Sequence, residues 1–161
     1  METHNGGIFH ASDTLLHRLD SAQHHFLIEI DMHTATAFTD HNFAPPTLRR
    51  NIGILGLLHK RVLGKCHPIF QKLLPFHSDV FGWIRAEEHN KQLYNHILEV
   101  HYQQALHRRS VFGMVTQYNK LPQNVVDCDS VSKFQHYLTL MARKRCQDGD
   151  ADWMHTFSCR S

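Results

Sequence analysis

The chain has 161 residues, of which 42% are hydrophobic and 20% are charged, and its formal net charge is +2. A chain of this length and composition is expected to fold as one domain with a buried core, which excludes wholesale disorder. The longest apolar run covers residues 52–58, far short of the roughly 20 residues that span a bilayer. We therefore expect no membrane partner.

The ends and the cysteines favour an intracellular protein. The N-terminal residues have neither the basic start nor the apolar segment of a secretory signal. The four cysteines contain no CxxC pair, so reduced thiols are expected: Cys66, Cys128, Cys146 and Cys159. The sequence does not distinguish a nuclear from a cytoplasmic location.

The first half of the chain predicts a loose tail followed by three helices. Residues 1–11 are the tail, and Ser12 or Asp13 can cap a helix whose apolar residues recur at helical spacing. A short helix is expected over 34–40. Pro45 and Pro46 suit the first turn of a third helix, and Gly64 suits its end. Within it, Gly53 and Gly56 would let another element approach closely.

The second half is more irregular. A short helix is expected over 68–74, a loop over 75–90, and a helix over 92–106, where residues 97–102 could instead form a strand. Helical spacing continues over 111–122. Asp129 or Ser130 can then cap a last long helix. The sequence thus predicts an all-α, single irregular domain of five or six helices over 12–146, with a C-terminal tail over 147–161.

Basic residues are unevenly distributed, and this suggests a polyanion partner. No carboxylate lies between Asp40 and Asp79, whereas that stretch holds six lysines and arginines. Such local basic fields favour RNA or DNA, with contacts independent of sequence, although a solvated helix face is an equally good interpretation. The candidate contacts are Arg49, Arg50, Lys60, Arg61, Arg108, Arg109, Arg143, Lys144 and Arg145.

Patterns for catalysis and metal binding are absent from the sequence. None of the sixteen histidines is three or four residues from another, the spacing that places two ligands on one helix face. Glycine-rich phosphate loops and a Gly-x-Ser-x-Gly elbow are also missing. We therefore expect no catalytic residues, no metal site and no cofactor.

An aromatic-Asn-x-Leu-Pro segment ends one predicted helix and precedes the next. Tyr118 in this segment could stack on a base, but an anchor in the core between two helices is the favoured interpretation. Pro122 prevents the helix from continuing. The structural residues expected around this junction are Tyr118, Asn119, Leu121, Pro122, Phe134 and Leu138.

Three blocks of the chain resemble the C-terminal, post-thumb region of non-LTR (LINE-type, jockey-like) retrotransposon reverse transcriptases. The blocks cover residues 19–27, 44–64 and 108–138. Tyr118 stands where that family often has tryptophan, and Pro46-Thr47 replaces its common Pro-Leu or Leu-Ser. The resemblance implies a helical region that supports RNA or target DNA. It does not extend to polymerase activity, because the chain contains no Asp-Asp pair to hold catalytic metal ions. The endonuclease of the family is also absent.

The sequence leaves two hypotheses. The first is a non-catalytic C-terminal fragment of such a reverse transcriptase that binds RNA or DNA through a basic helical surface. The second is a stand-alone helical protein-interaction module, or a decayed remnant, without nucleic-acid binding. The oligomeric state is not indicated by either.

Overall fold

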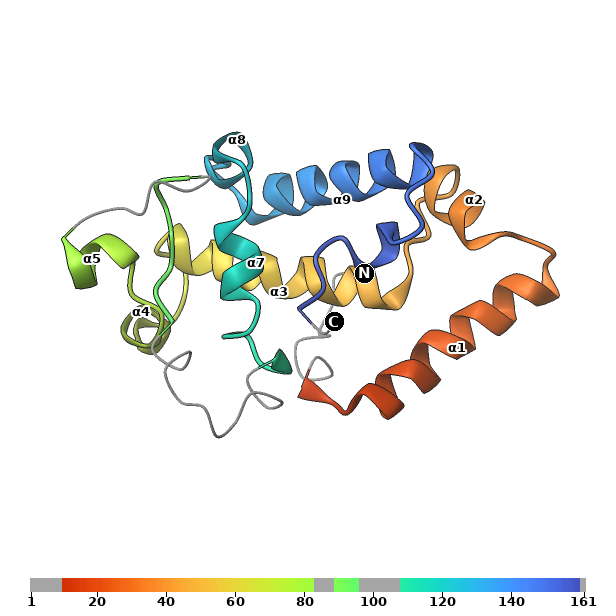
Figure 1. Ribbon diagram of the computed structural model, residues 1–161, viewed down its shortest axis with the longest axis horizontal. Helices are drawn as coiled ribbons and strands as arrows, with labels where there is room; N and C mark the ends of the chain where they lie inside the picture. The colour runs from red at the N-terminus through yellow and green to blue at the C-terminus, as the bar shows by residue number, and fades with distance from the viewer. Residues whose placement is uncertain (1–9, 83–88, 96–107, 160–161) are drawn as a thin grey trace.

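The computed structural model describes residues 10–82, 89–95 and 108–159 (Figure 1). These residues form eight α-helices and a short 3-10 helix, and the only β pairing among them is an isolated bridge between Phe76 and Leu93. The all-α prediction is confirmed, with more and shorter helices than expected. The helices are α1 (Asp13–Glu29), α2 (Thr34–Thr39), α3 (Pro46–Val62), α4 (Pro68–Leu73), α5 (His77–Phe81), α7 (Val115–Asn119), α8 (Gln123–Val126), α9 (Val131–Gln147) and η4 (Trp153–His155).

The centre of the fold is the pair of long helices α3 and α9, which run in opposite directions side by side (Figure 1). Their facing residues are fully buried, including Leu55 and Leu58 on α3 and Phe134 and Leu138 on α9. Gly56 lies at this contact, where an added Cβ would be 2.9 Å from Cδ of Gln135. The close approach expected at the α3 glycines is thus found at Gly56.

The predicted helix ends are confirmed where a local hydrogen bond or backbone angle defines them. The Ser12 hydroxyl accepts from the Leu15 N–H, and the Ser130 hydroxyl accepts from the Lys133 N–H at 3.2 Å. Pro46 occupies the first turn of α3. Gly64 ends that helix with a φ of 70°, a left-handed conformation that glycine adopts at little cost.

The segment 75–95 differs from its prediction. α5 lies where a loop was expected, and residues 92–95 are extended rather than helical. The extended segment is held by tertiary hydrogen bonds: the His77 N–H donates to the Gln92 carbonyl, and the Tyr94 N–H donates to the Pro75 carbonyl. These two hydrogen bonds stabilise the extended conformation of residues 92–95 more than their helix propensity would stabilise a helix. The remainder of the predicted 92–106 helix, residues 96–106, lies outside the described residues.

Two further predictions change at the C-terminal side. The helix expected over 111–122 is limited to α7, because residues 111–114 form turns and Pro122 is the N-cap of the separate helix α8. Residues 148–159 are not a free tail. They fold back onto the core, where Trp153 and Phe157 are buried and the Trp153 ring stacks on Phe38 at 5.0 Å.

α1 is the most peripheral long helix (Figure 1). Leu16 and Leu27 are its only buried residues, and the Asp20 carboxylate joins it to Arg50 of α3. Among the described residues, no helix combines the length and apolar character needed to cross a membrane.

Candidate nucleic-acid interface

Two of the predicted basic contacts are buried structural residues. Both terminal nitrogens of the Arg50 guanidinium donate to the Asp20 carboxylate, at 2.7 and 2.8 Å, and Arg50 is 6% exposed. Arg61 is equally buried. Its Nε donates to the Leu74 carbonyl at 2.6 Å, and its guanidinium lies 4.2 Å from the centre of the Phe76 ring. These side chains join elements inside the protein, so a nucleic acid could not contact them without disrupting the fold.

Two other arginines contact neighbouring elements from the surface. Arg49 is exposed, and it donates to Oε1 of Gln23 on α1 at 2.9 Å. Arg143 donates to Oδ1 of Asn42 at 2.7 Å and lies over the Phe38 ring. Both therefore stabilise the packing of α1 and α2 against the α3–α9 pair.

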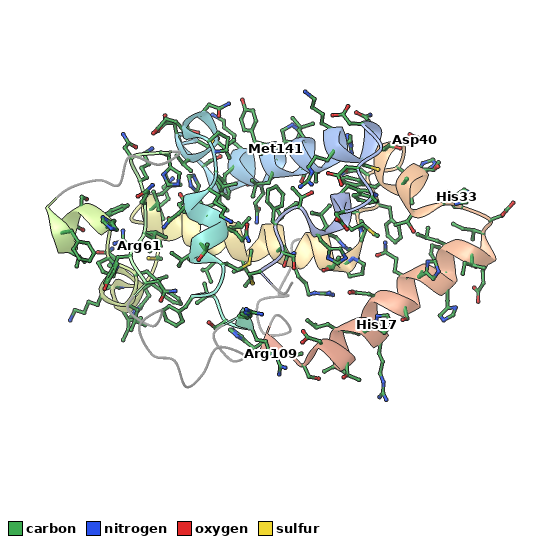
Figure 2. The ribbon with its side chains drawn as sticks, in the orientation of Figure 1. His17, His33, Asp40, Arg61, Arg109 and Met141 are labelled. Atoms are coloured by element: carbon green, nitrogen blue, oxygen red, sulfur yellow. The ribbon has the colours of Figure 1, made fainter. Side chains whose placement is uncertain are left out.

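The remaining predicted contacts lie on separate parts of the molecule. Arg109 forms a long ion pair with Asp13, and Arg145 pairs with Asp150 just beyond α9. Lys144 and Arg108 are exposed. Figure 2 shows Arg61 and Arg109 on different elements, well separated in the view. The nine predicted residues do not form one continuous basic surface.

Three exposed lysines lie on the consecutive stretch of chain where α3 ends and α4 follows. Lys60, Lys65 and Lys72 are exposed, and none of them pairs with a carboxylate in the described part of the chain. The Lys60 carbonyl accepts from the Lys65 N–H, which fixes these two residues side by side. Lys72 lies two residues before Leu74, the partner of Arg61 on α3. We name Lys60, Lys65 and Lys72 the lysine cluster.

The aspartates beside the lysine cluster are already paired. Asp127 accepts from Lys91 at 2.7 Å, and Asp129 pairs with Lys133 at 3.0 Å. The hydrogen bond from Lys91 lowers the pKa of the Asp127 carboxyl, and that from Lys133 lowers the pKa of Asp129. Lys65 donates to the backbone carbonyl of Asp129 at 3.2 Å and not to its carboxylate.

Behind this surface lies a buried polar group centred on the predicted aromatic anchor. Tyr118 is fully buried, and its hydroxyl lies 3.1 Å from Nδ1 of His59. Nε2 of His59 lies 2.9 Å from the Cys128 carbonyl, and a carbonyl only accepts. His59 therefore carries its hydrogen on Nε2 and accepts from Tyr118. Its ring stacks on Phe134 at 4.1 Å.

Asn119 has a structural role that the sequence pattern indicates only in outline. Its amide both donates to and accepts from the backbone of Leu93, at 2.9 and 3.0 Å. The Asn119 side chain thus makes the two hydrogen bonds with Leu93 that the backbone of a neighbouring strand would otherwise make. Leu121 is buried and Pro122 forms the cap position of α8, so this junction is structural.

A groove of about 350 Å³ opens between α1, the start of α3 and the C-terminal segment. His17, His24 and His155 line it, together with Asp20, which is committed to Arg50. In the described ranges, no three histidine, cysteine or acidic side chains are placed to hold a metal ion.

Comparisons with known proteins give no relative: no family model, no curated protein and no solved structure matches this chain.

Proposed function

We propose that this chain is a non-catalytic helical domain that binds RNA or DNA through the lysine cluster, without sequence specificity. The observation that carries this proposal is the exposure of Lys60, Lys65 and Lys72 beside aspartates that other lysines neutralise. Unpaired ammonium groups at one site attract the closely spaced charges of a phosphate backbone. The proposed contact surface keeps Lys60 from the sequence-based set and leaves out the buried Arg50 and Arg61.

The proposal includes an origin as the C-terminal region of a non-LTR reverse transcriptase. The three sequence blocks support this origin, and they contain much of the structural frame: Asp20 and Arg50, the α3 glycines, and the Tyr118–Pro122 junction. The missing Asp-Asp pair supports a role in binding rather than in polymerisation.

The test compares two variants that remove the same charge from different parts of the molecule. K60Q/K72Q removes two lysines of the cluster, and the control R108Q/K144Q removes two exposed cations on other elements. Binding to a single-stranded RNA of about 20 nucleotides is measured by fluorescence anisotropy over a range of salt concentrations. For K60Q/K72Q we expect weaker binding to all RNA sequences and a salt slope smaller by about 1 to 2, because each phosphate contact contributes about 0.7.

The control should bind like the wild type. Equal losses in both variants would indicate general charge attraction and no localised site. Wild-type affinity in K60Q/K72Q would contradict the proposal, and the protein-interaction module would then be the better explanation of the fold.

A further inference from the structure

α1 and its C-cap residue Ile30 carry an apolar stripe that is mostly exposed in the described structure, although the Phe26 ring contacts Phe43 edge-on with 6.2 Å between ring centres. Leu15, Leu19, Phe26 and Ile30 are 50%, 42%, 49% and 46% exposed. Because successive helical residues are about 100° apart, these four residues and Ala22 lie on one face of the helix. The buried Leu16 and Leu27 lie on the neighbouring face, toward the core. α1 thus has two apolar faces: one is buried against the core, and the other is mostly exposed.

The stripe is nearly symmetric in residue size about its centre. Ala22 lies in the middle, with two large residues on each side. If a second α1 packs against it in the opposite direction, Leu15 faces Ile30 and Leu19 faces Phe26. The two Ala22 residues then meet near the crossing point, where small side chains allow the helices to approach. Such self-complementarity is what a two-fold symmetric interface requires.

Charges along one edge of the stripe favour the same orientation. Arg18 lies near the start of α1 and Glu29 at its end, and helical spacing places both beside the stripe on the same edge. In an antiparallel pair, each Arg18 lies within reach of Glu29 from the other copy. In a parallel two-fold pair, the charged edges of the two copies would lie on opposite sides of the interface, so Arg18 and Glu29 would not pair between the copies.

We propose that α1 is a self-association surface and that its occupant is α1 of a second copy, packed antiparallel. The stripe with its charged edge would bury on the order of 1,000 Å² in total, at the low end of specific interfaces. The dimer is therefore weak and concentration-dependent. This inference is independent of nucleic-acid binding, because the lysine cluster lies on other helices.

Sedimentation equilibrium over about 1 to 500 µM protein tests the surface, since a weak dimer dissociates within that range. The wild type should pass from monomer to dimer. L19E/F26E should raise the dimer Kd by about 100-fold or more, because it places charges at the centre of the interface. Both residues are exposed in the monomer, so circular dichroism should show unchanged helicity.

Ile28 supplies the matched control. It is 59% exposed but lies about half a turn away from the stripe, so I28E should dimerise like the wild type. A wild type that stays monomeric throughout the range overturns the proposal. Dimerisation that survives L19E/F26E, or that I28E abolishes, also overturns it.

Charge reversal tests the orientation. R18E or E29R alone should weaken the dimer by about three- to tenfold, because each loses two symmetric exposed pairs. The double variant R18E/E29R restores both pairs in an antiparallel dimer and should recover wild-type association. Additive weakening in the double variant would overturn the antiparallel arrangement.

Discussion

At the scale of single residues, the least expected feature is His59. The sequence places it among sixteen histidines without distinguishing it, yet it is fully buried between Tyr118, Phe134 and the Cys128 carbonyl. Burial lowers the pKa of the His59 imidazole, and the nearby charges of Lys91 and Lys65 lower it further. Burial also raises the pKa of the Tyr118 hydroxyl, so both groups are neutral at physiological pH. The pair forms a neutral polar contact inside an apolar core.

This arrangement predicts acid-sensitive stability. The pKa of His59 is lower in the folded state than in the unfolded chain, so the unfolded state binds the proton more readily. The stabilisation is therefore complete above about pH 6.5 and is lost as the pH falls toward the folded-state pKa. Urea unfolding at several pH values should show a decrease of up to about 1.4 kcal/mol per pH unit from this group.

The variant His59→Gln isolates that contribution. It should be less stable at pH 7.5, because a flexible amide replaces a stacked and hydrogen-bonded ring. Its stability should change less between pH 7 and 5 than that of the wild type, because it lacks the contribution of His59. The other histidines are present in both proteins and contribute equally. Parallel pH profiles for the two proteins would show that His59 does not titrate in this window.

At the scale of elements, the C-terminal segment departs most from its prediction. Residues 147–161 are short of strong helical periodicity, and three aspartates give the segment a solvated pattern. The structure nevertheless places Trp153 against Phe38, with the ring planes 2° apart. α2 and the C-terminal segment, more than 100 residues apart, therefore stabilise each other. The spacing of apolar residues does not reveal such a contact, because one large aromatic residue holds this segment against the core and no repeating pattern is needed.

Removing the Trp153 side chain should therefore destabilise the whole domain. We expect Trp153→Ala to reduce the free energy of unfolding by about 3 kcal/mol, the lower part of the range for large aromatic truncations in cores. Thermal or urea denaturation gives the measurement. His155→Ala, at an exposed position two residues away, should change stability by less than about 0.5 kcal/mol. If the two variants are equally stable, the segment is a tail after all.

At the scale of the whole molecule, charge is distributed unequally along the long axis. Among the described residues, the end formed by the last turns of α3, α4, α5, the segment 89–95, the end of α7 and the start of α9 has seven basic and three acidic residues: Lys60, Arg61, Lys65, Lys72, Lys91, Lys120 and Lys133 against Asp79, Asp127 and Asp129. In the described residues, the opposite end, with α1, α2, the start of α3, the end of α9 and the C-terminal segment, has six basic residues and eight acidic ones. A net charge of +2 hides this asymmetry. A polyanion would therefore meet one end of the molecule preferentially.

The two proposals together predict a length effect in RNA binding. A dimer joined through α1 carries two lysine clusters, and α1 and α4 lie toward different ends of the molecule (Figure 1). At protein concentrations that populate the dimer, an RNA of about 60 nucleotides should bind about tenfold or more tightly than one of about 15 nucleotides. L19E/F26E should lose this additional affinity while it retains the short-RNA affinity. An unchanged length effect in that variant would show that the dimer does not contribute.

The sequence by itself determined the features that depend on short-range physics. These features act within a few residues of one another, so they can be recognised from the sequence alone. They are the helical periodicity, the Ser12 and Ser130 caps, Pro46 in a first turn and Gly64 at a helix end. These features predicted an all-α domain and the positions of its long helices. They also marked the Tyr118–Pro122 junction as structural.

Only the tertiary structure decided which charged residues are available. Arg49 and Arg50 are adjacent in the sequence, yet the first is exposed and the second is buried against Asp20, thirty positions earlier. Neighbouring residues on a helix point about 100° apart, so a run of basic residues is divided between surface and interior. Which basic residue is buried depends on where a carboxylate or carbonyl from a distant part of the sequence lies. That information is carried by the packing of α1, α3 and α4, and not by the local pattern.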